Sequence, residues 1–265
     1  MNLQDLKRVT DEHGGSDRMP LLFVGHGNPM NAIEENRFST SWQQIGHSLP
    51  RPKAILSVSA HWLTNGTRVL NVQRPETIHD FGGFPRELYE QQYPAPGAPE
   101  WAVETQKLAK KKHILLDDEW GFDHGTWSVL KKMFPGADIP VYQLSIDYRA
   151  PIREHYDLAQ ELRALREKGV LVLGSGNIVH NLPAVNFTDP RPYDWAKEFD
   201  EKISGWITGG DDMSIVEFQK LGRLASLAHP TYDHFLPLIY TLGFRHASEE
   251  PVFFNDGFEI GRAHV

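Results

Sequence analysis

Short runs of large apolar residues alternate along the chain with segments whose apolar positions recur every three or four residues. The runs predict β-strands, which in chain order cover residues 21–24, 54–60, 67–72, 113–116, 141–146, 170–173 and 251–254. Several runs are almost continuous Val, Ile and Leu, which is typical of strands buried on both faces of a sheet.

Helices are predicted between these strands from the three-to-four spacing and from Pro and Gly at the boundaries, over residues 99–112, 151–168, 193–207 and 231–242. Pro237 lies inside the last segment and is expected to kink it or to leave one carbonyl unpaired. The alternation predicts an α/β fold, with one domain over residues 20–265 and a central, largely parallel or mixed sheet flanked by helices. Residues 1–19 are predicted to be a polar, poorly ordered arm.

A long stretch between the third and fourth strands, residues 73–97, is rich in Pro, Gly and aromatic residues. Loops of this length in a compact domain are usually functional. We therefore expect this loop to take part in the site.

Composition narrows the class of protein. Hydrophobic residues make up 40% of the chain and charged residues 23%, with a formal net charge of -8. These values are typical of a soluble globular protein, and the negative charge opposes nucleic-acid binding, which needs clustered Lys and Arg. We find no signal peptide and no apolar stretch of membrane-spanning length, so a cytoplasmic protein without a membrane partner is expected.

Histidine is unusually frequent, with 13 residues, whereas cysteine is absent. Any metal must therefore be held by His, Asp or Glu. Three predicted strands lead into a histidine, namely His26, His61 and His180. In open α/β sheets ligands bind at the carboxyl ends of the strands. We therefore expect these three side chains to converge on one crevice, with the neighbouring glycines permitting close backbone approach.

Further candidates lie in three other segments. LAHPTYDHFLPL carries His229, expected in a turn, and His234, expected with Asp233 in the first turn of a helix. WGFDHGTW carries Asp123 and His124 in an aromatic loop, where the pair would act either as support for a ligand or as an acid/base group. The third segment is His79-Asp80 in the long loop.

A histidine-rich site with few carboxylates favours Zn, Fe or another divalent ion that accepts imidazole ligands. The spacing does not separate water activation on Zn from O₂ and substrate binding on Fe(II). The zinc-protease helix motif, the phosphate-binding loop and the serine nucleophile elbow do not occur in the chain.

Seven motifs taken together resemble a known family. FVGHGNPMNAI, VSAHW, TIHDFGGFP, YPAPG, WGFDHGTW, GSGNIVHNL and HPTYDHFLPLIYTLG occur in the order seen in class III extradiol ring-cleavage dioxygenases, most like the 4,5-DOPA dioxygenase branch. The resemblance covers about residues 20–260; the tail GFEIGRAHV departs from it. It implies metal-dependent cleavage of a small, DOPA-like catechol by O₂, beside rather than between the hydroxyls, to a semialdehyde.

The resemblance also implies a ligand set for one divalent ion per chain, Zn²⁺ or Fe²⁺. His26 and His61 match two ligands of the family, and His234 is the expected third. His229 is the alternative third ligand, or else an outer contact of the site.

Catalytic roles follow from the same resemblance. His180 matches an acid/base histidine that could also ligate the metal, and His124 matches a histidine that binds or polarises substrate and oxygen. The long loop is expected to cover the substrate, with Phe81, Phe84 and Tyr93 as ring contacts. A zinc hydrolase and a non-enzymatic metal-binding protein are the alternative functions, and the oligomeric state stays open.

Overall fold

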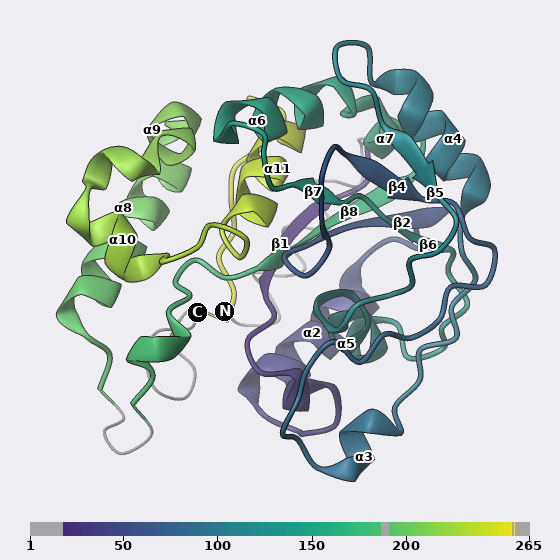
Figure 1. Ribbon diagram of the computed structural model, residues 1–265, viewed down its shortest axis with the longest axis horizontal. Helices are drawn as coiled ribbons and strands as arrows, with labels where there is room; N and C mark the ends of the chain where they lie inside the picture. The colour runs from purple at the N-terminus through teal and green to yellow at the C-terminus, as the bar shows by residue number, and fades with distance from the viewer. Residues whose placement is uncertain (1–17, 187–190, 256, 258–265) are drawn as a thin grey trace.

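The computed structural model describes residues 18–186, 191–255 and 257 (Figure 1). Most of the predicted N-terminal arm and the tail from residue 258 onward lie outside the described residues. None of the described helices is long and apolar enough to cross a bilayer.

The core of the fold is a four-stranded sheet with the order β1-β8-β2-β6. Its strands are β1 (Leu21–Gly25), β8 (Val170–Gly176), β2 (Ala54–Ser59) and β6 (Val141–Gln143). All neighbouring pairs are parallel, and every residue of β2 and β8 is buried. This confirms the α/β fold with a largely parallel sheet, because strands covered on both faces need the continuous apolar runs found in the sequence.

Two further pairs of short parallel strands complete the strand structure of the described residues. One joins β3 (Leu63–Thr64) to β7 (Ile146–Asp147), and the other joins β4 (Arg68–Leu70) to β5 (Leu115–Asp117). The predicted strand over 141–146 is thus two short strands in different sheets.

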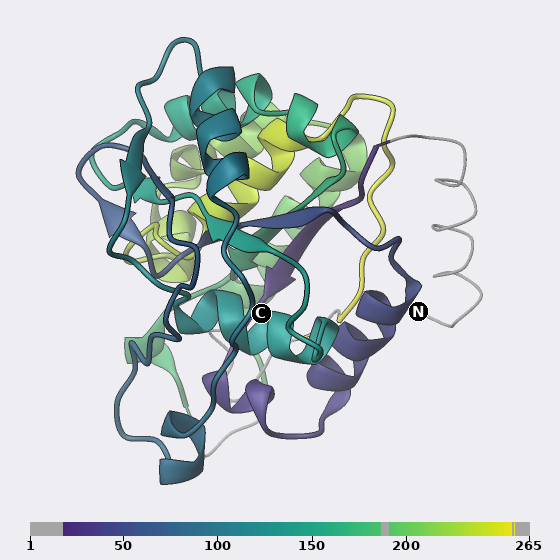
Figure 2. The same ribbon diagram turned by 90° about the vertical axis from the view of Figure 1, so that its right-hand side faces the viewer.

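Helices cover both faces of the central sheet (Figures 1 and 2). One face carries α2 (Arg37–Ser48) and α5 (His124–Met133). The opposite face carries α4 (Pro99–Leu108), α6 (Ile152–Glu161), α7 (Ala164–Glu167) and α11 (Leu236–Phe244). A separate helical group lies beside α6 and α11 and consists of α8 (Asp194–Gly209), α9 (Asp212–Val216) and α10 (Arg223–Ala228).

Short helices occupy the connections. They are η1 (Pro29–Ala32), α3 (Arg86–Tyr89) within the long loop, η2 (Leu182–Ala184) and η3 (Phe218–Leu221).

Several predicted helix boundaries are wrong. The helix predicted over 99–112 ends at Leu108, because the backbone N–H groups of Lys110 and Lys111 donate to the carboxylate of Glu161 instead of continuing the helix. The helix predicted over 151–168 is interrupted between α6 and α7. The one predicted over 231–242 begins only at Leu236, so Pro237 stands in its first turn, where no N–H partner is required and no kink results.

The strand predicted over 251–254 is also wrong, since the segment has no regular structure. Val252 and Phe253 are 45% and 41% exposed, so this apolar run is not part of the buried sheet. The sequence interpretation also missed α2 and α5, although both begin with a helix cap. The side chain of Asn36 accepts from the N–H groups of Phe38 and Ser39 to cap α2.

A buried arginine joins the two ends of the described chain. The Arg166 side chain is fully enclosed, and its guanidinium donates to the carbonyl oxygens of Met19 (2.9 Å) and Phe244 (3.0 Å). It also binds both carboxylate oxygens of Glu249, at 2.7 and 2.6 Å. A bidentate pair of this kind is strong because both partners are charged and their geometry matches.

We predict that Glu249→Gln lowers the free energy of unfolding by about 2 kcal/mol, because it leaves a buried guanidinium without its counter-charge. Burial acts to raise the pKa of Glu249, but hydrogen bonds from Arg166 and from the His246 backbone outweigh it and hold the pKa below its ordinary value. The pair therefore stabilises the fold above the unfolded-state pKa of about 4.3, and its contribution is lost as pH falls through the lower folded pKa.

Chemical denaturation of both proteins at pH 7 and pH 3 measures this difference, which should shrink at the lower pH. Glu167→Gln is the matched control, since that side chain is 62% exposed and its ion pair with Arg18 is long, at 3.9 Å, and therefore weak. Equal losses in the two variants would contradict the assignment.

Candidate metal centre

The parallel strands bring two of the predicted histidines to one edge of the sheet. Gly25 at the end of β1 pairs with Gly176 at the end of β8, and Ser59 at the end of β2 pairs with the residue before Gly176. His26 directly follows β1, and His61 comes two residues after β2. The predicted convergence at the carboxyl ends of the strands is therefore present for this pair.

His234 reaches the same edge from the turn that precedes α11. Its carbonyl oxygen accepts a hydrogen bond from the Asn177 backbone N–H at 2.8 Å, just beyond the end of β8. A Cβ atom on Gly176 would lie 2.2 Å from this oxygen, so only glycine allows the approach. The expected role of the β8 glycines in close packing is confirmed here. The prediction that His234 lies in the first helical turn is wrong, because the helix starts two residues later.

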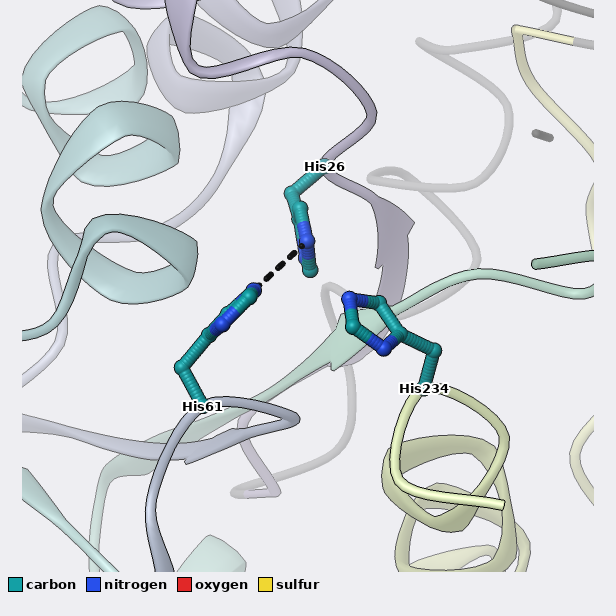
Figure 3. A group of neighbouring side chains, drawn as sticks. All are labelled: His26, His61 and His234. Atoms are coloured by element: carbon teal, nitrogen blue, oxygen red, sulfur yellow. Dashed lines mark hydrogen bonds between the residues drawn. The ribbon is translucent and has the colours of Figure 1, made fainter. Parts of the chain in front are cut away.

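The rings of His26, His61 and His234 surround one point (Figure 3). Their centroids are 5.0 Å apart for His26–His61, 5.2 Å for His26–His234 and 4.9 Å for His61–His234. One nitrogen from each ring lies within 4.8 Å of the other two. The Nε2 atoms of His26 and His61 face each other at 3.1 Å.

A serine hydroxyl determines which nitrogen of His26 carries its proton. The Ser175 Oγ donates to the carbonyl oxygen of Gly125 at 2.6 Å, which uses its only hydrogen. The same Oγ lies 3.0 Å from Nδ1 of His26, so this nitrogen must be the donor. In the neutral ring the Nε2 atom then has a lone pair that points at the other histidines.

Carboxylates have the same effect on the other two rings. Nδ1 of His234 lies 2.5 Å from the Asp233 carboxylate, and Nδ1 of His61 lies 3.4 Å from that of Asp80. An ionised carboxylate only accepts hydrogen bonds, so both contacts favour a proton on Nδ1 and a lone pair on Nε2. Carboxylates that orient histidines in this way are typical of metal sites.

The outer contacts therefore favour Nε2 lone pairs directed toward one point, where a cation would bind them, and the 3.1 Å contact between the Nε2 atoms of His26 and His61 is the one dashed in Figure 3. Burial, with a contribution from His124, lowers the pKa of His61 to about 3, so this ring is uncharged near neutral pH. Two nitrogens that are each about 2.1 Å from one ion are about 3.0–3.4 Å apart. The 3.1 Å separation of the two Nε2 atoms fits this range. The residues thus fit a divalent metal ion.

His124 lies beside this group as the first residue of α5. Its ring centroid is 3.9 Å from that of His61, and its Nδ1 lies 3.0 Å from the Asp80 carboxylate. The predicted Asp123–His124 couple is not formed, because the Asp123 carboxylate accepts instead from Ser59 (2.6 Å) and Gln143 (2.7 Å). Asp123 also accepts from the backbone at the start of α5, and it thereby fixes the helix that carries His124.

His180 stacks on the outside of His234. The two centroids are 3.4 Å apart and the rings are nearly parallel, with 5° between their planes. Burial lowers the pKa of His180 to about 4. The structure thus joins the third strand-end histidine to the group through His234.

His229 occupies a different environment. Its ring is fully buried among the aromatic rings of Phe199, Phe218 and Phe235, with centroids 5.6, 6.1 and 4.9 Å away. Its Nε2 lies 2.6 Å from the carbonyl oxygen of Ile178, to which it donates. The geometry thus places His229 in the packing between the loop after β8 and the helical group.

The long loop contributes aromatic rings to the rim of the site. The Phe81 centroid is 5.5 Å from that of His124, and Phe84 contacts Phe81 at 5.4 Å. Tyr93 does not fit the predicted role of a ring contact. It is 1% exposed, and its hydroxyl donates to the carbonyl of Phe134, so it belongs to the packed base of the loop.

Two residues of the site were given no role by sequence reasoning. Asp80 stood out only as the neighbour of His79, although a carboxylate in a loop rich in Gly and aromatic residues is a usable signal. Ser175 gave a weaker signal, as a small hydroxyl between two glycines at the end of a buried strand. Their roles come from contacts between distant segments, which spacing does not reveal.

We predict that Gly125→Ala weakens zinc binding by the protein. The added Cβ would lie 2.5 Å from Ser59 Oγ and 3.0 Å from Cδ2 of His61, so it must displace the histidine. Isothermal titration with Zn²⁺ measures the effect. Gly205→Ala in α8 is the control, because a Cβ there has no neighbour within 4 Å and should leave the affinity unchanged. Unchanged zinc affinity in Gly125→Ala would contradict the proposed fit.

Comparison with known proteins gives a consistent result. The family described as "Catalytic LigB subunit of aromatic ring-opening dioxygenase" matches residues 20–253. The chain is 46% identical to a 4,5-DOPA dioxygenase extradiol of Escherichia coli (strain K12), over 96% of this chain and 95% of that protein. It is 38% identical to a 4,5-DOPA dioxygenase extradiol of Beta vulgaris, over 84% and 85% of the two chains.

A solved structure is similar over nearly the whole chain. It is the crystal structure of an uncharacterised protein from Escherichia coli K12, which is 41% identical and superposes with a TM-score of 0.80. The similarity covers 93% of this chain and 97% of that chain.

Proposed function

This chain belongs to the family of the catalytic LigB subunit of aromatic ring-opening dioxygenases and is an extradiol ring-cleaving enzyme, and we propose that it cleaves a DOPA-like catechol with O₂ at a metal held by His26, His61 and His234. The observation that carries the proposal is the approach of one ring nitrogen from each of the three histidines to within 4.8 Å of the other two. Neither alternative function, hydrolase or non-enzymatic metal-binding protein, gains support from the relatives.

His234 is our choice for the third ligand over His229. The Nδ1 atom of His234 contacts Asp233, which favours a lone pair on the nitrogen that faces His26 and His61. His229 uses its Nε2 to donate to the Ile178 carbonyl and is enclosed by phenylalanine rings. Moving it into the ligand group would break this hydrogen bond and open the packing around α10.

Fe²⁺ is the ion we propose for the active form. An ion held by these residues supplies a Lewis acid that lowers the pKa of a catechol hydroxyl and, if it is redox-active as Zn²⁺ is not, the electron exchange that O₂ needs. Neutral imidazole ligands suit Fe²⁺ and Zn²⁺ alike, so the ligand set leaves the choice to the chemistry.

Two histidines are proposed to handle protons and substrate. His180 is held against the ligand His234, is uncharged near neutral pH because burial lowers its pKa, and would accept a proton from a catechol hydroxyl. His124 lies against the ligand His61 and would bind the substrate or oxygen from that side. Phe81 adds an aromatic edge next to His124 and is the residue of the loop best placed to contact the substrate ring.

The proposed reaction breaks one ring C–C bond beside the two hydroxylated carbons. Both atoms of O₂ enter the product, which carries one carboxylate and one aldehyde, so no further reductant is consumed. DOPA is the proposed substrate because proteins 46% and 38% identical to this chain carry the name 4,5-DOPA dioxygenase extradiol.

We predict that metal-free protein loaded anaerobically with Fe²⁺ consumes O₂ and forms a yellow semialdehyde when it is mixed with DOPA and air. An oxygen electrode and the visible spectrum measure the reaction, and the Zn²⁺-loaded protein is run beside it. His246→Asn is a matched control, because this histidine is exposed and its ring contacts Ser248 rather than the histidine group. Absence of O₂ uptake with either ion and with any catechol would overturn the proposed function.

Single substitutions should separate the proposed roles. His234→Asn should abolish stoichiometric metal binding, whereas His180→Asn should keep the metal and lower kcat by about 10²- to 10⁴-fold, the usual contribution of an acid/base group. His229→Asn should keep the metal but lower stability by about 2–3 kcal/mol, since it opens a buried aromatic cluster. Metal analysis, steady-state kinetics and thermal unfolding give the three readouts. Metal loss in His229→Asn with retention in His234→Asn would exchange the two assignments.

A further inference from the structure

Building on the proposed function, we propose that Asp80 is a positioning residue that holds the protons of two imidazoles, those of His61 and His124, on their outer nitrogens. Its carboxylate would thereby keep both Nε2 atoms available, one for the metal and one for the substrate or oxygen. Asp80 acts through these rings and is not itself a ligand of the proposed ion.

The geometry carries this inference. Oδ1 of Asp80 accepts the backbone N–H of His124 at 2.9 Å, which fixes the orientation of the carboxylate. Oδ2 lies 3.0 Å from Nδ1 of His124 and 3.4 Å from Nδ1 of His61. One carboxylate thus faces both rings, whose centroids are only 3.9 Å apart. Because the carboxylate is negatively charged, its position beside both Nδ1 atoms favours a proton on each of them.

The charge of Asp80 is consistent with this role. Its carboxylate lies 3.0 Å from Nδ1 of His124 and 3.4 Å from Nδ1 of His61, and an ionised carboxylate has no proton to donate to either ring.

The loop holds Asp80 firmly from one side. The backbone N–H of Ile78 donates to the Phe122 carbonyl at 2.7 Å, and the indole N–H of Trp127 donates to the Ile78 carbonyl at 2.8 Å. The Thr77 hydroxyl accepts the backbone N–H of Tyr93 at 2.9 Å. The first two contacts pin the segment before Asp80 to the start of α5, and the third joins it to the later part of the loop.

The segment after Asp80 has a different character. Gly82 and Gly83 follow within three residues, and a Cβ on either would meet no atom within 4 Å. Asp80 therefore lies between the anchored base of the loop and this glycine pair.

Asp80→Asn tests the inference because it changes chemistry with little change in shape. The amide oxygen can still accept the His124 backbone N–H, but the amide nitrogen would then present a donor to both Nδ1 atoms. Each ring would be driven to carry its proton on Nε2, which removes the lone pair that the metal requires. We expect the dissociation constant for Zn²⁺ to rise by about 10- to 100-fold, the usual effect of removing an outer carboxylate.

Thr77→Val is the matched control. It removes the hydroxyl that anchors the same loop but leaves the Asp80 carboxylate intact, so its Zn²⁺ affinity should stay within about twofold of the natural protein. Asp80→Glu keeps the charge on a longer side chain and should recover part of the affinity lost in Asp80→Asn. If Asp80→Asn fails to fold, the comparison of Asp80→Glu with Thr77→Val decides the question. The variant with the displaced carboxylate should bind Zn²⁺ less tightly than the variant in which only the loop is loosened.

A second readout separates the two imidazoles. In a His124→Asn background, Asp80→Asn should still weaken Zn²⁺ binding through His61. At saturating metal it should cause little further loss of kcat, because its effect on His124 is already absent. Full additivity of the two substitutions in kcat would remove His124 from the proposed role.

Two results would overturn the inference. Zn²⁺ affinity and kcat of Asp80→Asn both equal to those of the natural protein would show that the carboxylate does not position the rings. The second result is a natural protein that binds two ions per chain and loses one of them in Asp80→Asn. His61, Asp80 and His124 would then form a second ion site, since their ligand atoms all lie within 4.8 Å of one another. Zn²⁺ affinity is measured without catechol, so failure of ring cleavage would count against the proposed function and not against Asp80.

Discussion

The centre of this protein depends on the close approach of three imidazole rings that the fold holds around one point. The Nε2 atoms of His26 and His61 lie 3.1 Å apart, and the contacts on the outer side of the rings favour their protons there. Each ring is held from behind, by Ser175, Asp80 or Asp233. The proposed cation would bind at the point that the rings face, so the outer contacts would define the site as much as the ligands do.

The parallel sheet explains how such an arrangement is held. Strands that run in the same direction end at one edge of the sheet. The hydrogen-bonded register of β1, β8 and β2 places His26 and His61 at levels along the strands that differ by no more than one residue. Glycines at Gly176 and Gly125 then admit the turn of His234 and the start of α5 into van der Waals range. The strand ends, the turn of His234 and α5 are thereby packed against the sheet, whereas Asp80 and Phe81 come from the long loop.

The sheet, and the grouping of His26 and His61 at its edge, were predictable because both are marked by local sequence patterns. Continuous apolar runs identify buried strands, and a polar residue directly after such a run identifies the functional edge. Features that depend on distant partners were less predictable. The end of α4 is set by Glu161, and the apolar run at 251–254 forms no strand. The partner of His124 is Asp80 rather than its neighbour Asp123. Adjacency in sequence is a poor guide to side-chain pairing where a helix begins, because the capping residue turns its side chain back to the backbone.

The placement of the three rings along the chain links metal occupancy to folding. His26 lies near the start of the described chain and His234 near its end, so no fragment that lacks either terminal part can assemble the group. Binding of the proposed ion would therefore be coupled to completion of the whole sheet and α11, and an ion with affinity only for the assembled state would shift the folding equilibrium toward it. Metal supply would then affect the amount of folded protein as well as its activity.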